Sequence, residues 1–149
     1  MTRSRRMRNE RGAALIEAAM TIPLLLFVSV AIFEFGRAFE TWQVMTNAAR
    51  EGARVAVLPN KPAGAVEARV KDYMQMGALS NWAQATISIQ PNVPIGIGVG
   101  TASGSQVTVS YPFQFMVLQP VANLVVSGST VGAPITLTTS AVMRNESQF

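Results

Sequence analysis

The stretch that decides the fold is RGAALIEAAMTIPLLLFVSVAIFEF, residues Arg11 to Phe35. Within it, residues 13–33 carry one charged side chain, Glu17, in 21 positions. A helix of that length spans roughly 30 Å, the thickness of the hydrocarbon core of a bilayer. We therefore predict a transmembrane helix over residues 13–33. An ionised carboxylate at Glu17 costs on the order of 2–3 kcal/mol there, unless a partner or the interface compensates it.

The residues before this helix resemble the class III signal of type IV pilins and pseudopilins, a short basic leader that ends in glycine. Gly12, Ala13 and Glu17 stand at the last leader position and at the first and fifth positions after it. The resemblance implies cleavage between Gly12 and Ala13 by a prepilin peptidase. The glycine leaves room for the protease and is expected to keep the backbone locally unwound. The new ammonium group of Ala13 would lie about one helical turn from Glu17, and in pilins this glutamate meets the amine of a neighbouring subunit.

Two other interpretations of the N-terminus stay open. In the first, the leader is retained as an uncleaved signal anchor, and Glu17 snorkels to the cytoplasmic interface. In the second, a secretory signal peptide ends at Ser29-Val30-Ala31, which has the small-x-small pattern of a cleavage site. The apolar run continues to Phe33 and contains a glutamate, which favours a retained helix.

The positive charge of the chain is concentrated in residues 1–12, the predicted basic leader. This segment holds one acidic residue, Glu10, and five basic ones, Arg3, Arg5, Arg6, Arg8 and Arg11. The remaining residues carry seven basic and seven acidic side chains. A basic tail directly before a membrane helix keeps that end in the cytoplasm, so no nucleic-acid partner is expected.

The composition excludes several kinds of chemistry. The chain has no cysteine and no histidine, which excludes a lipoprotein anchor, a disulfide scaffold, histidine-based triads and zinc sites. The glycine-rich stretch at residues 96–104 lacks a following helix and a Lys-Ser/Thr pair, so it predicts a flexible hairpin connection rather than a phosphate loop. The acidic residues form no pair suited to glycoside or metal chemistry. We therefore expect that the protein is not an enzyme. We expect it to have no catalytic residue, no cofactor, no metal and no small-molecule substrate.

The first helix is expected to continue past the membrane to Leu58, where Pro59 and Asn60 end it. Residues 34–58 have helical spacing, with a predicted polar face made of Arg37, Glu40, Gln43, Asn47, Arg50, Glu51 and Arg54. The predicted apolar face is made of Phe35, Phe39, Trp42, Met45, Ala49, Gly52, Ala53 and Ala56. Residues 13–58 would form one helix of roughly 70 Å, with a kink or local unwinding at Pro23 and an amphipathic second half packed on a soluble domain.

Residues 59–149 are predicted to form an extracytoplasmic α+β domain. A second helix is expected over residues 62–79, with one face made of Val66, Val70, Tyr73, Met74 and Gly77. Strand-like alternation follows at residues 85–90 (ended by Pro91), 93–99, 107–113 and 135–143. An apolar segment at 115–126 is a short helix or an excursion that packs on the long helix. The fold class is α+β: a long N-terminal helix, a short second helix and a small antiparallel sheet of three or four strands.

Two sequence blocks after the apolar helix, Glu34-Phe35-Gly36-Arg37 and Asn47-Ala48-Ala49-Arg50-Glu51-Gly52-Ala53-Arg54, resemble the TadE family. These are minor pseudopilins of the tight-adherence (Flp) pilus machinery. The resemblance covers about residues 11–57 and implies a pilin-like fold. It also implies an inner-membrane location with the N-terminus cytoplasmic and the domain outside the cytoplasm. Its implied partners are a prepilin peptidase and the other minor and major pilin subunits. The residues of the two blocks have a structural interpretation, as close-packing small residues and an exposed face of charges, and we assign them no chemistry.

Two alternatives to a tight-adherence pseudopilin remain. One is a signal-anchored extracytoplasmic module whose β-rich half binds a ligand or an adhesion partner. The other is a type II secretion pseudopilin, which has the same chemistry at its N-terminus.

Overall fold

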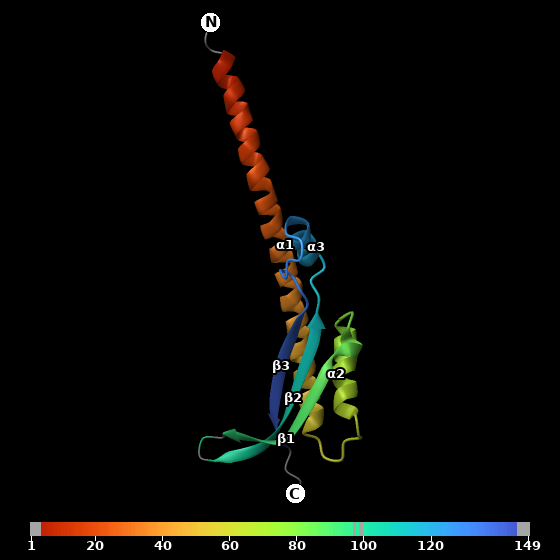
Figure 1. Ribbon diagram of the computed structural model, residues 1–149. Helices are drawn as coiled ribbons and strands as arrows, with labels where there is room; N and C mark the ends of the chain where they lie inside the picture. The colour runs from red at the N-terminus through yellow and green to blue at the C-terminus, as the bar shows by residue number, and fades with distance from the viewer. Residues whose placement is uncertain (1–3, 97, 99, 146–149) are drawn as a thin grey trace.

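The computed structural model describes residues 4–96, 98 and 100–145, so residues 1–3 of the predicted leader and Glu146 lie outside the described residues. The elements follow in the order α1 (Ser4–Ala56), α2 (Ala65–Met76), the short 3-10 helix η1 (Trp82–Gln84), β1 (Thr86–Gly96), β2 (Thr101–Phe113), α3 (Leu118–Val125) and β3 (Ile135–Arg144). Figure 1 shows α1 as a long rod. Its N-terminal half stands clear of the other elements, and its C-terminal half packs beside the sheet and α2. The fold is α+β and pilin-like, as the sequence predicts.

The first helix is longer and more regular than expected. It begins at Ser4, inside the predicted leader, and continues without interruption through Gly12 and Pro23. The expectation of an unwound backbone at these two positions is therefore wrong. A proline removes one N–H donor from a helix, and here the helix is extended on both sides, so the remaining hydrogen bonds keep the segment helical.

The second helix is shorter than residues 62–79, because a glycine bounds it at each end. Gly64 precedes it in the left-handed region with φ 76°, and the N–H of Gly77 closes its last turn on the carbonyl of Tyr73. The buried residues of α2 are Val66, Val70 and Met74, which confirms three residues of the predicted face, whereas Tyr73 and Gly77 are partly exposed.

The sheet contains three antiparallel strands in the order β1-β2-β3, each paired with the next one in sequence. Strand β1 does not end at Pro91; it continues to Gly96 and includes residues predicted as a separate strand. The pairing of β1 with β2 shifts between Gln90 and Val93, where Asn92 has φ 61°. A bulge on an edge strand accommodates proline, whose missing N–H is not needed by a neighbour. The glycine-rich segment connects β1 to β2 as a hairpin, as expected.

The core lies between the C-terminal half of α1, α2 and the sheet. Its buried members are Met45, Ala48, Ala49, Ala53, Ala56, Val66, Val70, Met74, Leu79, Ala85, Val107, Val109, Tyr111 and Phe113. The predicted apolar face of α1 is only partly correct, because Phe35, Phe39 and Trp42 are exposed. The buried stripe lies roughly a quarter turn around the helix from these aromatic residues. It is built largely from small side chains, which let α2 and the sheet approach α1 closely.

Gly52 marks the closest approach of α1 to its neighbours. A Cβ atom at this position would lie 2.5 Å from Cγ2 of Val70 and 3.3 Å from Cγ1 of Val107. Valine is branched at Cβ and stiff, so neither side chain can move aside cheaply. Gly36, earlier in α1, has nothing within 4 Å of the same atom.

We predict that Gly52→Leu destabilises the domain by about 3 kcal/mol, because it overpacks a closed core. The matched variant Gly36→Leu should leave stability unchanged or raise it by up to about 1 kcal/mol, through helix propensity alone. Urea unfolding of the full chain in detergent micelles, followed by tryptophan fluorescence, measures both. Equal midpoints for the two variants would contradict the close contact between α1 and α2.

Candidate membrane and subunit interface

The N-terminal half of α1 presents an uncovered apolar surface. The exposed large apolar side chains between Ala13 and Phe33 are Leu15, Ile16, Met20, Ile22, Leu24, Leu25, Leu26, Phe27, Val28, Ile32 and Phe33. By length and composition, this helix could cross a membrane. Leaving one such side chain in water instead of burying it forgoes about 1.5–3 kcal/mol. This surface is therefore unfavourable in water and needs lipid or other helices around it.

The three residues of the predicted processing and pairing site lie on this exposed part of α1. Gly12 has open space around it, and Ala13 and Glu17 are exposed. The hydroxyl of Thr21 donates a hydrogen bond to the main-chain carbonyl of Glu17 at 2.7 Å. Among the described residues, the Glu17 carboxylate has no ion pair or hydrogen bond. Any partner for this carboxylate must come from outside the described part of the chain.

A second acidic residue, Glu34, is fully buried at the end of the apolar stretch. Its Oε1 accepts hydrogen bonds from the backbone N–H of Met116 at 2.8 Å and of Val117 at 2.6 Å. Its Oε2 pairs with Nη1 of Arg37 at 2.7 Å. The two N–H groups directly precede α3 and have no partner within that helix. Hydrogen bonds from N–H groups to an ionised carboxylate are among the stronger ones, so Glu34 fixes the start of α3 to α1.

Aromatic side chains surround this contact. The ring of Phe115 packs edge-to-face on Phe113 at 5.2 Å and on Phe35 at 6.3 Å between centroids. The guanidinium carbon of Arg37 lies 5.4 Å from the centroid of Phe113. Each such pair adds roughly 0.5–1.5 kcal/mol beyond the area it buries. The segment after β2 is therefore held to α1 by both polar and aromatic contacts.

The role of Glu34 was not predicted from the sequence. The spacing of Glu34 and Arg37 was a local signal, because residues three apart face each other on a helix. The N–H groups that Glu34 binds lie 82 and 83 residues further along the chain, beyond the reach of any local pattern.

The second sequence block, residues 47–54, has a structural role. Ala48, Ala49 and Ala53 are fully buried against the neighbouring elements. Arg50 and Arg54 are exposed as expected, but Glu51 is only partly exposed and pairs with a residue of α2.

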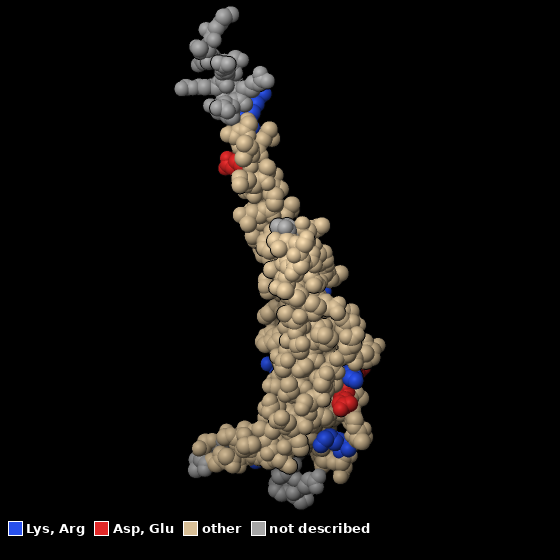
Figure 2. All heavy atoms as spheres, viewed as in Figure 1, with Lys and Arg blue, Asp and Glu red and all other residues tan. Residues whose placement is uncertain are grey.

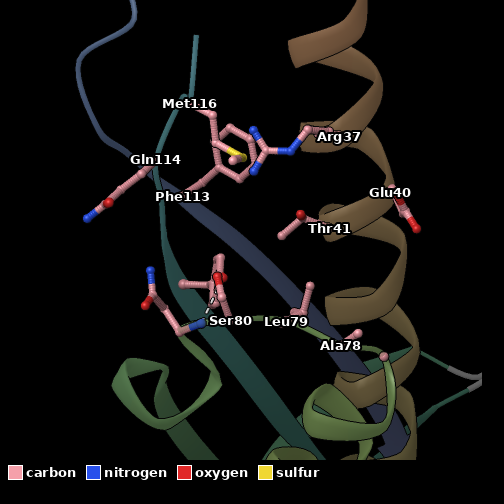
Figure 3. Close-up of a pocket in the computed structure, with 12 residues that line it drawn as sticks. Arg37, Glu40, Thr41, Ala78, Leu79, Ser80, Phe113, Gln114 and Met116 are labelled. Atoms are coloured by element: carbon pink, nitrogen blue, oxygen red, sulfur yellow. Dashed lines mark hydrogen bonds between the residues drawn. The ribbon is translucent and has the colours of Figure 1, made fainter. Parts of the chain in front are cut away.

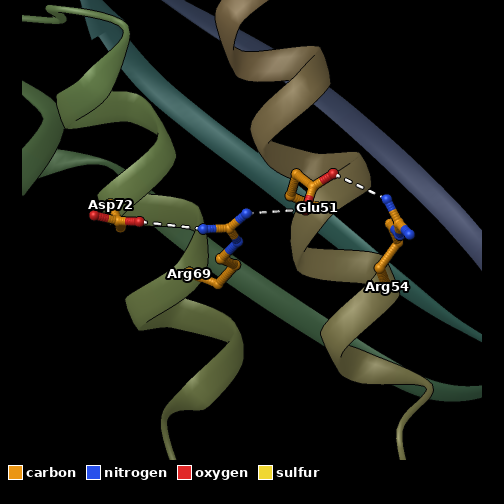
Figure 4. Close-up of polar contacts among 4 residues, drawn as sticks. All are labelled: Glu51, Arg54, Arg69 and Asp72. Carbon is orange, nitrogen blue, oxygen red and sulfur yellow. Dashed lines mark hydrogen bonds and ion pairs between the residues drawn. The ribbon is translucent and has the colours of Figure 1, made fainter.

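Figure 4 shows the resulting network, in which Glu51 lies between Arg54 at 3.4 Å and Arg69 at 3.2 Å. Arg69 also pairs with Asp72 of α2 at 3.3 Å. These side chains are between a quarter and two thirds exposed, so each pair is worth roughly 0–1 kcal/mol. The network aligns α2 with α1 and offers no reacting group.

An open groove of about 350 Å³ lies between α1, the turn after α2 and the end of β2. Figure 3 shows Arg37 and Thr41 of α1 on one side, and Phe113 and Gln114 on the other. The backbone N–H of Asn81 donates to the Tyr111 hydroxyl at 3.3 Å, which closes part of the floor. Within the described residues, no group of three or more acidic, histidine or cysteine side chains could hold a metal ion. The groove has the size of a small ligand site, but its lining is largely polar, whereas most ligand pockets are lined mainly by apolar side chains.

The fold and this surface define a class: an α+β, pilin-like protein whose N-terminal helix is apolar enough to cross a membrane. The comparison with protein families agrees, since the family described as TadE-like protein matches residues 12–54. The chain therefore carries a TadE-like family domain over these residues, and the family consists of pilin-type structural proteins rather than enzymes. No curated protein and no solved structure matches the chain.

We predict that Glu34→Ala destabilises the α1–α3 contact by about 2–4 kcal/mol, because it leaves two buried N–H donors and the Arg37 guanidinium without their acceptor. Hydrogen exchange at Met116, Val117 and the α3 amides should accelerate strongly. Glu40→Ala, which removes an exposed carboxylate from the same helix, should change stability by no more than about 0.5 kcal/mol. Unchanged exchange at Met116 and Val117 in Glu34→Ala would contradict the assigned contact.

Proposed function

We propose that this chain is a minor pseudopilin needed for assembly of a tight-adherence type IV pilus. It is a single-pass protein of the bacterial inner membrane, with its N-terminus in the cytoplasm and residues 59–149 outside. A prepilin peptidase removes residues 1–12, and the subunit then packs with other minor and major pilins through residues 13–58. The observation that carries the proposal is the exposed apolar half of α1, within a segment that matches the TadE-like family.

The proposed chemistry of assembly is the pairing of Glu17 with a new N-terminal amine. Cleavage after Gly12 leaves an ammonium group on Ala13, and the Glu17 carboxylate is exposed on the surface of α1. A carboxylate in lipid is costly, and an ammonium group on a neighbouring subunit offsets this cost. Such a pair forms at one axial offset between helices, so it also sets the register of the subunit.

The construction of α1 supports this role. The helix is continuous from Ser4 to Ala56, and its C-terminal half is locked into the core through Ala48, Ala49 and Ala53. If pairing at Glu17 fixes the axial position of the helix, it therefore also fixes the position of the domain, because one continuous helix joins the two. At 1.5 Å per residue, the distance from Glu17 to the core at Ala49 is roughly 48 Å.

A signal-anchored binding or adhesion module remains the second candidate, because the groove beside Arg37 and Thr41 has the volume of a small ligand site. In that case the chain retains its leader, and its function survives replacement of residues 13–33 by another apolar helix. A type II secretion pseudopilin shares the proposed chemistry and differs only in the machinery that it joins.

We predict that Gly12→Val leaves the leader attached, because a branched side chain fills the space needed at the scissile bond. N-terminal sequencing of protein purified from membranes should give Ala13 for the native chain and Met1 for this variant. Gly36→Val, which makes the same change outside the predicted signal, should still give Ala13. A native chain that begins at Met1 would instead support the signal-anchored module, and one that begins at Ile32 would support a removed signal peptide.

We predict that Glu17→Ala is processed normally but is incorporated poorly into pili. The apolar side chain is cheaper in lipid, so membrane insertion is kept while the partner for the Ala13 amine of a neighbour is lost. Immunoblotting of the sheared pili and of the membrane fraction measures the ratio of incorporated to unincorporated subunit. Thr21→Ala, one turn away on the same face, serves as the control and should be incorporated like the native chain. Normal incorporation of Glu17→Ala would rule out the amine–carboxylate pair.

A further inference from the structure

Helix α3 lies beside the part of α1 that leads into the apolar half. Figure 1 shows α3 nearer to the N-terminal end of the molecule than the sheet and α2. It is in contact with α1, and Val30 and Ala31 are partly buried within an otherwise exposed stretch. The backbone directly before α3 is bonded to Glu34. The helix therefore begins at the end of the predicted membrane span and runs alongside it.

Helix α3 buries one apolar face and exposes a large apolar side chain, Leu124, on its other side. Leu118 and Ala122, one turn apart, are buried against the rest of the protein. The exposed apolar side chains of the segment are Met116 (67%), Val117 (37%), Leu124 (87%), Val126 (60%) and Val131 (49%). Gln119 and Asn123 supply the polar positions of α3, so the exposed apolar area comes from Leu124 and from residues that flank the helix.

The part of the sequence that contains α3 also lacks charge. No charged residue lies between Asp72 and Arg144 in the sequence. Figure 2 shows the surface over α3 in tan, whereas most of the charged side chains visible on the domain lie further toward its opposite end. Ser, Thr, Asn and Gln supply the polarity of the segment, and these uncharged side chains cost less at a membrane interface than ionised ones.

The position of Glu34 fits a site of low water content. In water, the N–H groups of Met116 and Val117 could bond to solvent without a protein partner. At the edge of a bilayer this alternative is lost, and each backbone group needs an internal partner. The Glu34 carboxylate supplies the acceptor for both groups, and Arg37 neutralises its charge within the same contact.

We propose that residues 116–131, with α3 at their centre, lie in the extracytoplasmic interface of the bilayer beside α1, with Leu124, Val126 and Val131 in contact with lipid. We assign lipid as the occupant of this apolar surface for two reasons. The surface is continuous with the apolar surface of the predicted membrane span, and it lies level with the extracytoplasmic end of that span. This inference rests on the proposed membrane placement of residues 13–33, and the experiment separates the two.

The absence of cysteine makes a site-specific test possible. Four variants of the full chain, Leu124→Cys, Val131→Cys, Leu25→Cys and Met76→Cys, each receive one environment-sensitive fluorophore. All four positions are exposed, so the label does not disturb the core. Leu25 tests the span itself, and Met76 of α2 is an equally apolar, 75% exposed control away from α3. The proteins are placed in vesicles of phosphatidylethanolamine and phosphatidylglycerol at about one copy per vesicle.

Quenching by iodide in the water is compared with quenching by lipids that carry a spin label near the headgroup. The expected result for Leu124 and Val131 is a blue-shifted emission, loss of iodide quenching and strong quenching by the spin-labelled lipid. Met76 should show the reverse. Iodide quenching of Leu124 equal to that of Met76, with Leu25 protected, would overturn the α3 inference and leave the span intact.

Two other outcomes also overturn the inference. If Leu124 resists iodide but is not quenched by the lipid label, another part of the same chain covers α3 instead of lipid. If Leu25 is itself reached by iodide, residues 13–33 do not span the bilayer, and the proposed function fails together with the inference.

Discussion

The apolar half of α1 is almost entirely uncovered within the described part of its chain, and the rest of the structure depends on this constraint. The other half of the same helix is covered by α2 and the sheet, through small residues such as Ala48 and Ala53. One unbroken helix therefore belongs to two environments. A domain attached to such a rod has a fixed distance from the lipid, because the helix rises 1.5 Å per residue and has no flexible joint before Ala56.

Two carboxylates lie near the predicted boundaries of the span, and they differ in whether the chain itself supplies a partner. Glu34 is buried and satisfied by its own chain, through two backbone N–H groups and Arg37. Glu17 is exposed and has no partner among the described residues. After folding, the Glu17 carboxylate has no partner in the described part of the chain, and it lies on an apolar helix. Such a group is available for association with another subunit. The contrast with Glu34 supports the proposed intermolecular contact at Glu17.

Local periodicity was sufficient to predict the two main helices, the α+β class and most of the strands. Local periodicity did not predict which side of α1 is buried, because two neighbouring stripes of this helix are apolar. The aromatic stripe of Phe35, Phe39 and Trp42 has the stronger hydrophobic signal, yet the core uses the alanine and glycine stripe, because only small residues permit the approach of Val70 at Gly52. Contacts between distant segments, such as Glu34 with Val117, leave no trace in local spacing. Strand β1 passed through Pro91 because a bulge absorbs the proline, which residue type alone does not indicate.

A subunit held in a membrane by one helix can turn freely about the axis of that helix, and this freedom bears on the proposed pairing of Glu17 with a neighbouring subunit. Glu17 and Phe35 are 18 residues apart, about five helical turns, and so lie on the same side of α1. The exposed aromatic residues Phe35, Phe39 and Trp42 therefore lie on the same side of α1 as Glu17. If α3 lies in the interface beside α1, it supplies a second point of attachment and stops the rotation. The Glu34 contact then links the two attachments and fixes the side of α1, and with it Glu17, that faces an approaching subunit.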